Sequence, residues 1–158
     1  MEELGPDMPY ADELREFVRR VLALLGDDTT VILYGSMARG DYGDWSDVDL
    51  IVISDELHGN PLERTERLIK LNRGLYMPLE IAAYTREGFL RALRTLSPTA
   101  LDALVEGVVL HDNGFLAEAR AELARLVEEL ELVREGRCWW SLRRLREALS
   151  RAGEPVPG

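Results

Sequence analysis

Two aspartates, Asp47 and Asp49, stand two residues apart at the start of an apolar run that continues to Ile53. In a β-strand, side chains two residues apart leave the same face, roughly 6 to 7 Å apart along the backbone. Both carboxylates can therefore hold the same ions. Because close carboxylates repel one another unless cations lie between them, and because hard oxygen ligands suit Mg²⁺ or Mn²⁺, the pair indicates a divalent-metal site at the beginning of this strand.

A glycine and a serine, Gly35 and Ser36, stand where an apolar strand is expected to turn directly into a short helix. Such a turn presents backbone N–H groups and a hydroxyl, which are suitable partners for phosphate oxygens. The glycine lets phosphates approach the backbone closely. Arg39, one helical turn later, can add a charge-assisted contact to the same phosphates or pair with a nearby carboxylate.

A third carboxylate is expected on a neighbouring strand, since two-metal phosphoryl transfer needs a ligand where the nucleophile is activated. Glu80 is the best candidate, because it stands within the otherwise apolar segment from Leu79 to Tyr84. A charge there is costly unless it is exposed at the strand end or bound to something. An exposed edge position without a ligand is the alternative for this residue.

Three strands and a set of amphipathic helices are predicted to position these residues. The strands are expected at 31–34, 48–53 and 79–84, with a short edge strand at 108–110. Helices are expected at 14–25, from 62 to about 74, after Thr85, at 97–107, at about 114–133 and at 139–149. No internal repeat or low-complexity linker interrupts this order.

The composition is that of one ordinary folded domain, with 158 residues, 46% hydrophobic and 30% charged. We expect a principal domain over 8–112, a C-terminal helical extension of it over 113–151, and a frayed tail over 152–158. The single cysteine, Cys138, cannot form an internal disulfide, and no signal peptide or membrane-spanning run is evident. These features predict a soluble cytoplasmic protein.

The net charge of −10 argues against general attraction to nucleic acid or anionic membranes as the main activity. The charge is unevenly spread, since residues 137–151 contain five arginines and a single acid, Glu147. The simplest interpretation of that segment is a solvated helix face that offsets an acidic body. The alternative is a docking surface for an acidic partner or RNA.

The spacing of Gly35 and Ser36 from Asp47 and Asp49 resembles the signature of the nucleotidyltransferase superfamily related to DNA polymerase beta, and within it the minimal nucleotidyltransferases. That signature is Gly-Ser, a ten-residue gap and Asp-x-Asp. The resemblance continues through the strand of Glu80 and covers about residues 10 to 115. It departs from many minimal members at the third acid, which is aspartate in them and glutamate here.

The resemblance implies an α+β fold with a small mixed sheet flanked by helices. It also implies that AMP is transferred from ATP to an acceptor hydroxyl, with release of pyrophosphate. Asp47 and Asp49 would hold both metal ions, Mg²⁺ or Mn²⁺, and Glu80 would complete one metal shell and help deprotonate the acceptor. Gly35 and Ser36 would hold the triphosphate, and two further nucleotide-binding residues are expected, namely Arg39 and Ser46.

Three acceptors or modes of action remain open at this point. Minimal nucleotidyltransferases often act as antitoxins that modify a tyrosine of a HEPN-domain toxin, and the lack of a second substrate-binding domain favours such a macromolecular partner. An aminoglycoside-type enzyme acting on a small molecule is the second reading, in which a homodimer would complete the pocket. A non-catalytic antitoxin that acts by contact alone is the third.

Overall fold

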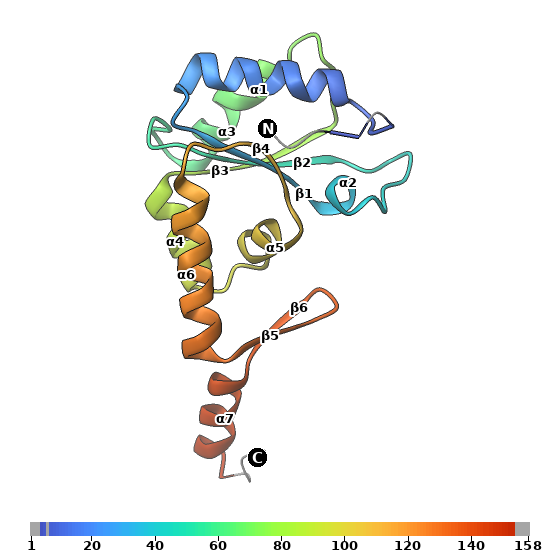
Figure 1. The fold of residues 1–158 in the computed structure, drawn as a ribbon. Coiled ribbons are helices and arrows are strands. Elements are labelled where there is room, and N and C mark those ends of the chain that lie inside the picture. Colours follow the sequence, from blue (N-terminus) through green and yellow to red (C-terminus); the bar gives the residue numbers. More distant parts are fainter. Residues whose placement is uncertain (1–3, 6, 154–158) are drawn as a thin grey trace.

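Four strands form one mixed sheet in the order β3, β2, β1, β4 in this computed structural model, which describes residues 4–5 and 7–153 (Figure 1). The strands are β1 (Thr30–Tyr34), β2 (Val48–Ile53), β3 (Leu79–Tyr84) and β4 (Val108–His111). Strand β1 is antiparallel to both β2 and β4, whereas β2 is parallel to β3. The expected α+β fold with a small mixed sheet is confirmed.

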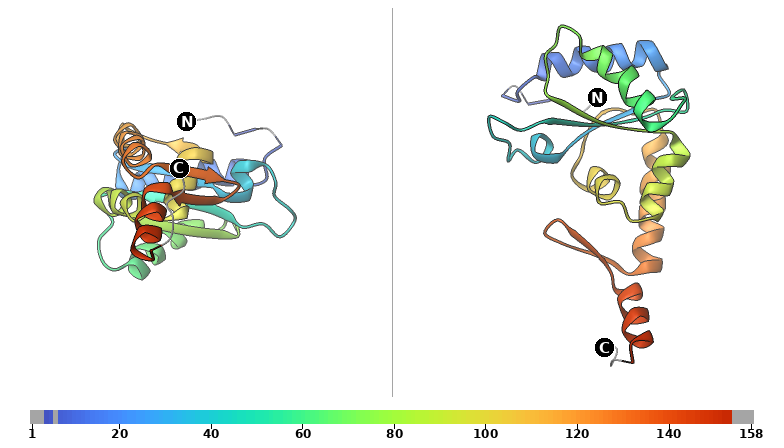
Figure 2. Two further views of the ribbon diagram at one scale, coloured as in Figure 1. Left: turned by 90° about the horizontal axis from the view of Figure 1, so that it is seen from below. Right: turned by 180° about the vertical axis from the view of Figure 1, so that it is seen from behind.

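Helices cover both faces of this sheet, as Figure 1 and Figure 2 show. On one face lie α1 (Ala11–Leu25), α3 (Pro61–Ile69) and a short 3₁₀ helix, η1 (Lys70–Asn72). The other face is covered by α4 (Arg86–Arg94), α5 (Pro98–Glu106) and α6 (Phe115–Leu130). No helix in the described part of the chain combines the length and apolar character that crossing a bilayer requires.

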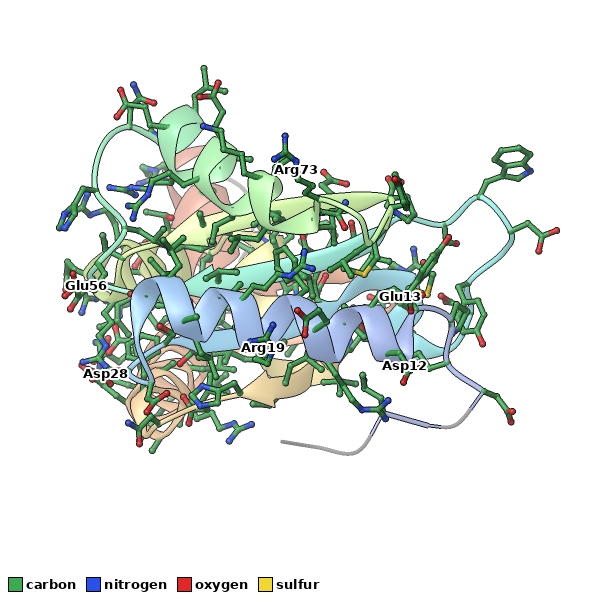
Figure 3. All side chains as sticks on the ribbon, turned by 90° about the horizontal axis from the view of Figure 1, so that it is seen from above. Asp12, Glu13, Arg19, Asp28, Glu56 and Arg73 are labelled. Atoms are coloured by element: carbon green, nitrogen blue, oxygen red, sulfur yellow. The ribbon has the colours of Figure 1, made fainter. Side chains whose placement is uncertain are left out.

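Helix α1 shows how periodicity sets this arrangement. Its apolar side chains recur every three to four residues, so Phe17 and Val21 are buried against the sheet. Asp12 and Arg19 lie on the opposite, solvent-facing side of the helix (Figure 3). The helix ends at Gly26, which has a positive φ of 93° and donates its backbone N–H to the carbonyl of Leu22.

The two central strands, β1 and β2, are buried on both faces, so two cores meet at the sheet. Residues such as Leu33 and Leu50 face α1, while Ile32 and Ile51 face α4, α5 and α6. Because side chains alternate along a strand, Asp49 leaves β2 on the same face as Ile51. The register pairs Asp49 with Tyr34 and with Glu80, so Asp49 lies at the end of the sheet where β1 finishes and β2 and β3 begin.

The region after α6 differs from the sequence prediction. The helix expected to reach residue 133 stops at Leu130, because Glu131 adopts a left-handed conformation with φ of 52°. A two-stranded hairpin follows, made of β5 (Leu132–Glu135) and β6 (Cys138–Ser141). The last helix, α7 (Leu142–Arg151), begins three residues later than expected. The segment 113–151 is therefore not wholly helical.

The hairpin and α7 extend away from the sheet in both Figure 1 and Figure 2. Ser141 caps α7 by accepting a hydrogen bond from the backbone N–H of Arg144, and no residue of α7 is buried. Of the tail expected to fray, residues 154–158 lie outside the described part of the chain.

Candidate active site

Strand register brings the three predicted acids together. Asp49 of β2 pairs with Glu80 of the parallel strand β3, and Asp47 stands immediately before β2 on the same side. One carboxylate oxygen from each of the three residues lies within 4.8 Å of the other two. Asp47 and Glu80 are exposed, while Asp49 is half-buried between them. The cluster is therefore open to solvent on one side and enclosed by protein at Asp49.

Burial and neighbouring acids raise the pKa of Asp49 to about 6. Desolvation is the largest cause, followed by the charge of Glu80 and a side-chain hydrogen bond to it, and then by the charge of Asp47. The positive charge of Arg39 acts in the opposite direction. A divalent cation bound between these carboxylates would reduce the repulsion among them.

Tyr34 completes the same row on the sheet, since it pairs with Asp49 across the antiparallel strands. Its pKa is raised to about 12, first by burial and then by the charges of Asp49 and Glu80. The phenol therefore stays neutral at physiological pH and forms one wall of the acid cluster.

The raised pKa of Asp49 predicts a pH-dependent stability in the metal-free protein. Its contribution is fully present below the ordinary carboxyl pKa of 3.8 and is lost as the pH rises through about 6, because only the unfolded chain ionises freely in that range. Asp49→Asn removes this loss of stability, because asparagine does not ionise. We expect the variant to gain about 1 kcal/mol, or about 2 to 4 °C in Tm, relative to the parent at neutral pH.

Thermal denaturation of both proteins at several pH values, in the presence of a chelator, measures this difference. The gain should shrink towards pH 4, and it should also shrink when Mg²⁺ is added to the parent protein at neutral pH. A difference in Tm that does not vary with pH would contradict the raised pKa of Asp49 as the source of the difference.

Gly35 brings the backbone against the acid cluster. It has a positive φ of 72°, and a Cβ at this position would lie 2.3 Å from Oδ2 of Asp49. Only glycine leaves the space that the carboxylate occupies. Ser36 follows at the start of α2 (Gly35–Arg39), where its carbonyl oxygen accepts hydrogen bonds from the backbone N–H groups of Gly40 and Asp41. The Gly-Ser turn thus lies directly beside Asp49, as expected.

The structure pairs the other two predicted nucleotide-binding residues with protein groups. Arg39 Nε lies 3.1 Å from Asp41 Oδ2, and its Nη1 lies 3.5 Å from Glu106 Oε2. The sequence left open whether Arg39 contacts phosphates or a carboxylate, and in this structure it pairs with two carboxylates. Ser46 Oγ accepts a hydrogen bond of 2.9 Å from the backbone N–H of Gly43 and closes a turn just before Asp47. Their roles towards a nucleotide stay predictions.

Sequence reasoning allowed Arg39 a carboxylate partner, but it did not anticipate that arginines of the hairpin share the same carboxylates. Glu106 also pairs with Arg134 of the hairpin, and Asp41 also pairs with Arg137 at the hairpin's tip. The only advance signal was the basic character of residues 137–151. The basic composition did not indicate where Arg137 would lie, because the hairpin itself was not predicted.

An open cavity of about 510 Å³ borders the acid cluster at Asp47. Three aromatic side chains contribute to its lining, namely Tyr10, Trp45 and Tyr76. Trp45 is 97% exposed and Tyr76 is 87% exposed. Binding pockets commonly combine aromatic walls with a few polar groups, so this cavity is suited to contact with a further molecule.

Comparison with known proteins agrees with this geometry. Residues 13–106 match the family model described as "Nucleotidyltransferase domain". The matched range begins in α1, ends with α5 and contains Asp47, Asp49 and Glu80. The chain therefore belongs to this family and is a nucleotidyltransferase.

Individual relatives are similar over part of the chain. A Methanocaldococcus jannaschii protein with the provisional name of protein adenylyltransferase is 35% identical over 65 residues, which are 40% of this chain and 64% of that protein. The match thus spans less than two thirds of the relative's own length.

Two solved structures have a similar fold. One is a chain from a toxin–antitoxin complex with AMP-PNP, with a TM-score of 0.51 and 18% identity. The other is a chain from the MntA–HpeT toxin–antitoxin complex, with a TM-score of 0.50 and 17% identity. Each alignment covers 74% of this chain and 92% of the other. At this level of identity the likeness establishes the fold.

Proposed function

We propose that this protein transfers AMP from ATP, with Mg²⁺ or Mn²⁺, to a hydroxyl group of a protein, most specifically a tyrosine of a HEPN-domain toxin. The acceptor oxygen would form a bond to the α-phosphorus as the bond between the α-phosphorus and its bridging oxygen breaks, and pyrophosphate would leave. The observation that carries this proposal is the group of three carboxylates within 4.8 Å of one another beside Gly35.

The donor set fits a hard divalent cation. All three groups offer carboxylate oxygens, and they crowd closely enough to raise the pKa of Asp49, first through burial and then through Glu80. When bound, such cations would neutralise the triphosphate and favour ionisation of the acceptor hydroxyl. We assign Asp47 and Asp49 to both ions and Glu80 to one of them.

The remaining roles follow from where each side chain lies. Gly35 and Ser36 would offer backbone and hydroxyl groups to the triphosphate next to Asp49. Arg39 and Ser46, on the α2 side of the cluster, would contribute further contacts to the nucleotide. Glu80 is exposed on β3, so its carboxylate can receive the proton of an approaching hydroxyl.

A macromolecular acceptor suits the open surroundings of the site. The cavity next to Asp47 is lined by exposed aromatic residues and is not closed by a second domain in the described part of the chain. A protein surface would supply the missing walls. The name of the adenylyltransferase relative and the toxin–antitoxin setting of chains with a similar fold support the same choice.

We further propose that residues 8–112 form the catalytic unit and that 113–151 extend the same domain. Phe115, Leu116 and Ala119 of α6 belong to the core on the acid-bearing face of the sheet, so the extension is packed onto the catalytic unit. A cytoplasmic location suits an ATP-consuming enzyme whose only cysteine, Cys138, is a free thiol.

Transfer can be tested with ATP radiolabelled at the α-phosphate, Mg²⁺ and a HEPN protein encoded beside this chain. The expected result is label on the HEPN protein, with intact-mass and peptide analysis placing adenylate on a tyrosine. A parallel reaction with ATP labelled at the γ-phosphate should leave the HEPN protein unlabelled, since the terminal phosphates depart as pyrophosphate.

Other outcomes distinguish the competing functions. Inhibition of the HEPN protein without any adenylate would support an antitoxin that acts by contact alone. Label on an aminoglycoside and none on protein would support the small-molecule enzyme, for which a homodimer would be expected to complete the pocket. Either result would overturn transfer to a protein.

A further inference from the structure

The tip of the β5–β6 hairpin lies beside the loop that leads into the acid cluster. A two-residue turn, Gly136 and Arg137, joins the strands, and Gly136 has the positive φ of 61° that such a turn favours. From this turn Arg137 reaches the loop after α2, where its Nη2 lies 3.3 Å from Asp41 Oδ2. Arg137 stands outside the range matched by the family model.

The hairpin is held in place on α5. Trp139 donates a hydrogen bond of 2.8 Å from Nε1 to Asp102 Oδ1. Arg134 Nη2 lies 2.5 Å from Glu106 Oε1, and its guanidinium stands 5.8 Å from the centre of the Trp139 ring. The position of the hairpin tip therefore follows from contacts behind it, and does not depend on the contact between Arg137 and Asp41 alone.

Two arginines converge on one carboxylate oxygen at this point. Asp41 Oδ2 lies 3.1 Å from Arg39 Nε and 3.3 Å from Arg137 Nη2. The arginines come from distant parts of the chain, α2 and the hairpin. The charge of Arg39 also acts on the acid cluster, since it opposes the effects of burial and of Glu80 that raise the pKa of Asp49. A single anionic oxygen between two guanidinium groups is also how phosphate oxygens are commonly bound.

We propose that Arg39 and Arg137 form a subsite for the terminal phosphates of the nucleotide, and that the Asp41 carboxylate occupies this subsite in the free protein. The proposal rests on the proposed function in one respect, namely that the substrate is a nucleoside triphosphate. On binding, phosphate oxygens replace Asp41 between the two guanidinium groups. No covalent step is involved. The hairpin thereby gives the catalytic unit a cation that its own fold does not provide.

The exposure of the groups suits such an exchange. The side chain of Arg137 is 65% exposed and that of Asp41 is 49% exposed, so their ion pair is weak and readily replaced. A triphosphate carries more negative charge than one carboxylate and offers several oxygens, so it competes well for two arginines.

The test is a calorimetric titration of the full chain with inorganic tripolyphosphate and Mg²⁺, a ligand without a base or sugar. We expect Arg137→Ala to weaken binding about fivefold to tenfold, as for the loss of one partly exposed charge-assisted contact. Asp41→Asn should tighten binding severalfold, because it removes the internal competitor. Arg151→Ala is the matched control, since Arg151 is an exposed arginine of α7, and its affinity should equal that of the parent.

The opposite responses of Arg137→Ala and Asp41→Asn separate this subsite from a merely structural bridge. If the Arg39–Asp41–Arg137 bridge only held the loop in place, both variants would weaken binding or leave it unchanged. Equal affinities of Arg137→Ala, Arg151→Ala and the parent would overturn the proposal, as would weaker binding by Asp41→Asn. Thermal denaturation of each variant confirms that it is folded.

The proposed function and this subsite can fail separately. If AMP transfer is absent but Arg137→Ala still weakens tripolyphosphate binding and Asp41→Asn tightens it, the phosphate subsite stands and the transfer reaction is wrong. If AMP transfer proceeds and Arg137→Ala binds tripolyphosphate like the parent, the transfer reaction stands and the subsite is wrong.

Discussion

Asp49→Asn is expected to lower the rate of AMP transfer by at least about a thousandfold while leaving a folded protein. Asp49 is the carboxylate that stands at the centre of the cluster, between Glu80 on β3 and the backbone at Gly35. An asparagine retains the shape of the side chain but removes the charge that would hold the cations. Because several kcal/mol of transition-state stabilisation depend on those ions, the loss should appear mainly in kcat.

The measurement is single-turnover transfer from ATP labelled at the α-phosphate, together with Mg²⁺ titration of the free protein. Asp47→Asn should behave similarly, because its carboxylate belongs to the same cluster. Asp27→Asn serves as the control. Asp27 is an exposed aspartate just before β1, whereas the acid cluster lies at the opposite end of that strand, beside Tyr34. Undiminished transfer by a folded Asp49→Asn protein would contradict the metal role of the cluster.

Much of the acid cluster was predictable from the sequence because strands impose a strict period of two. Once Val48 and Leu50 are assigned to a core, Asp47 and Asp49 must leave the other face. The strand containing Glu80 was also recognisable from its apolar composition. What the sequence did not contain was the register between strands, since that depends on which residues pair across β2 and β3. The structure supplies it by pairing Asp49 with Glu80.

The hairpin was missed for a local reason. The apolar pattern of α6 continues beyond its last residue, Leu130, to Leu132 and Val133. Periodicity alone therefore extends the predicted helix to residue 133. The helix actually ends because Glu131 adopts a left-handed conformation, a position at which glycine is the usual signal. The long-range contact between Trp139 and Asp102 then fixes the hairpin on α5. Such a contact between distant residues leaves no trace in a local pattern.

The same limit explains the surroundings of Arg39. Its place in the Gly-Ser helix was evident, but its partners Asp41 and Glu106 come from a loop and from the end of α5. Only the fold brings Arg137 to that loop. The sequence therefore predicted the groups that suit chemistry, and the structure shows which charges surround them.

Gly35→Ala is expected to reduce AMP transfer by about a hundredfold or more, although the added group is a single methyl. The new Cβ would lie 2.3 Å from Asp49 Oδ2, so either the carboxylate or the backbone at the start of α2 must move. Both belong to the proposed site. The positive φ of 72° adds a backbone cost of about 1 to 2 kcal/mol.

Gly26→Ala separates these two effects. Gly26 also has a positive φ, of 93°, but a Cβ there has no neighbour within 4 Å. It follows α1, before the start of β1, whereas Gly35 follows the end of that strand. We expect both variants to lose stability, measured as a lower Tm, and only Gly35→Ala to lose transfer activity and Mg²⁺ affinity. Equal activity of the two variants would mean that the close approach of Gly35 to Asp49 has no role in the reaction.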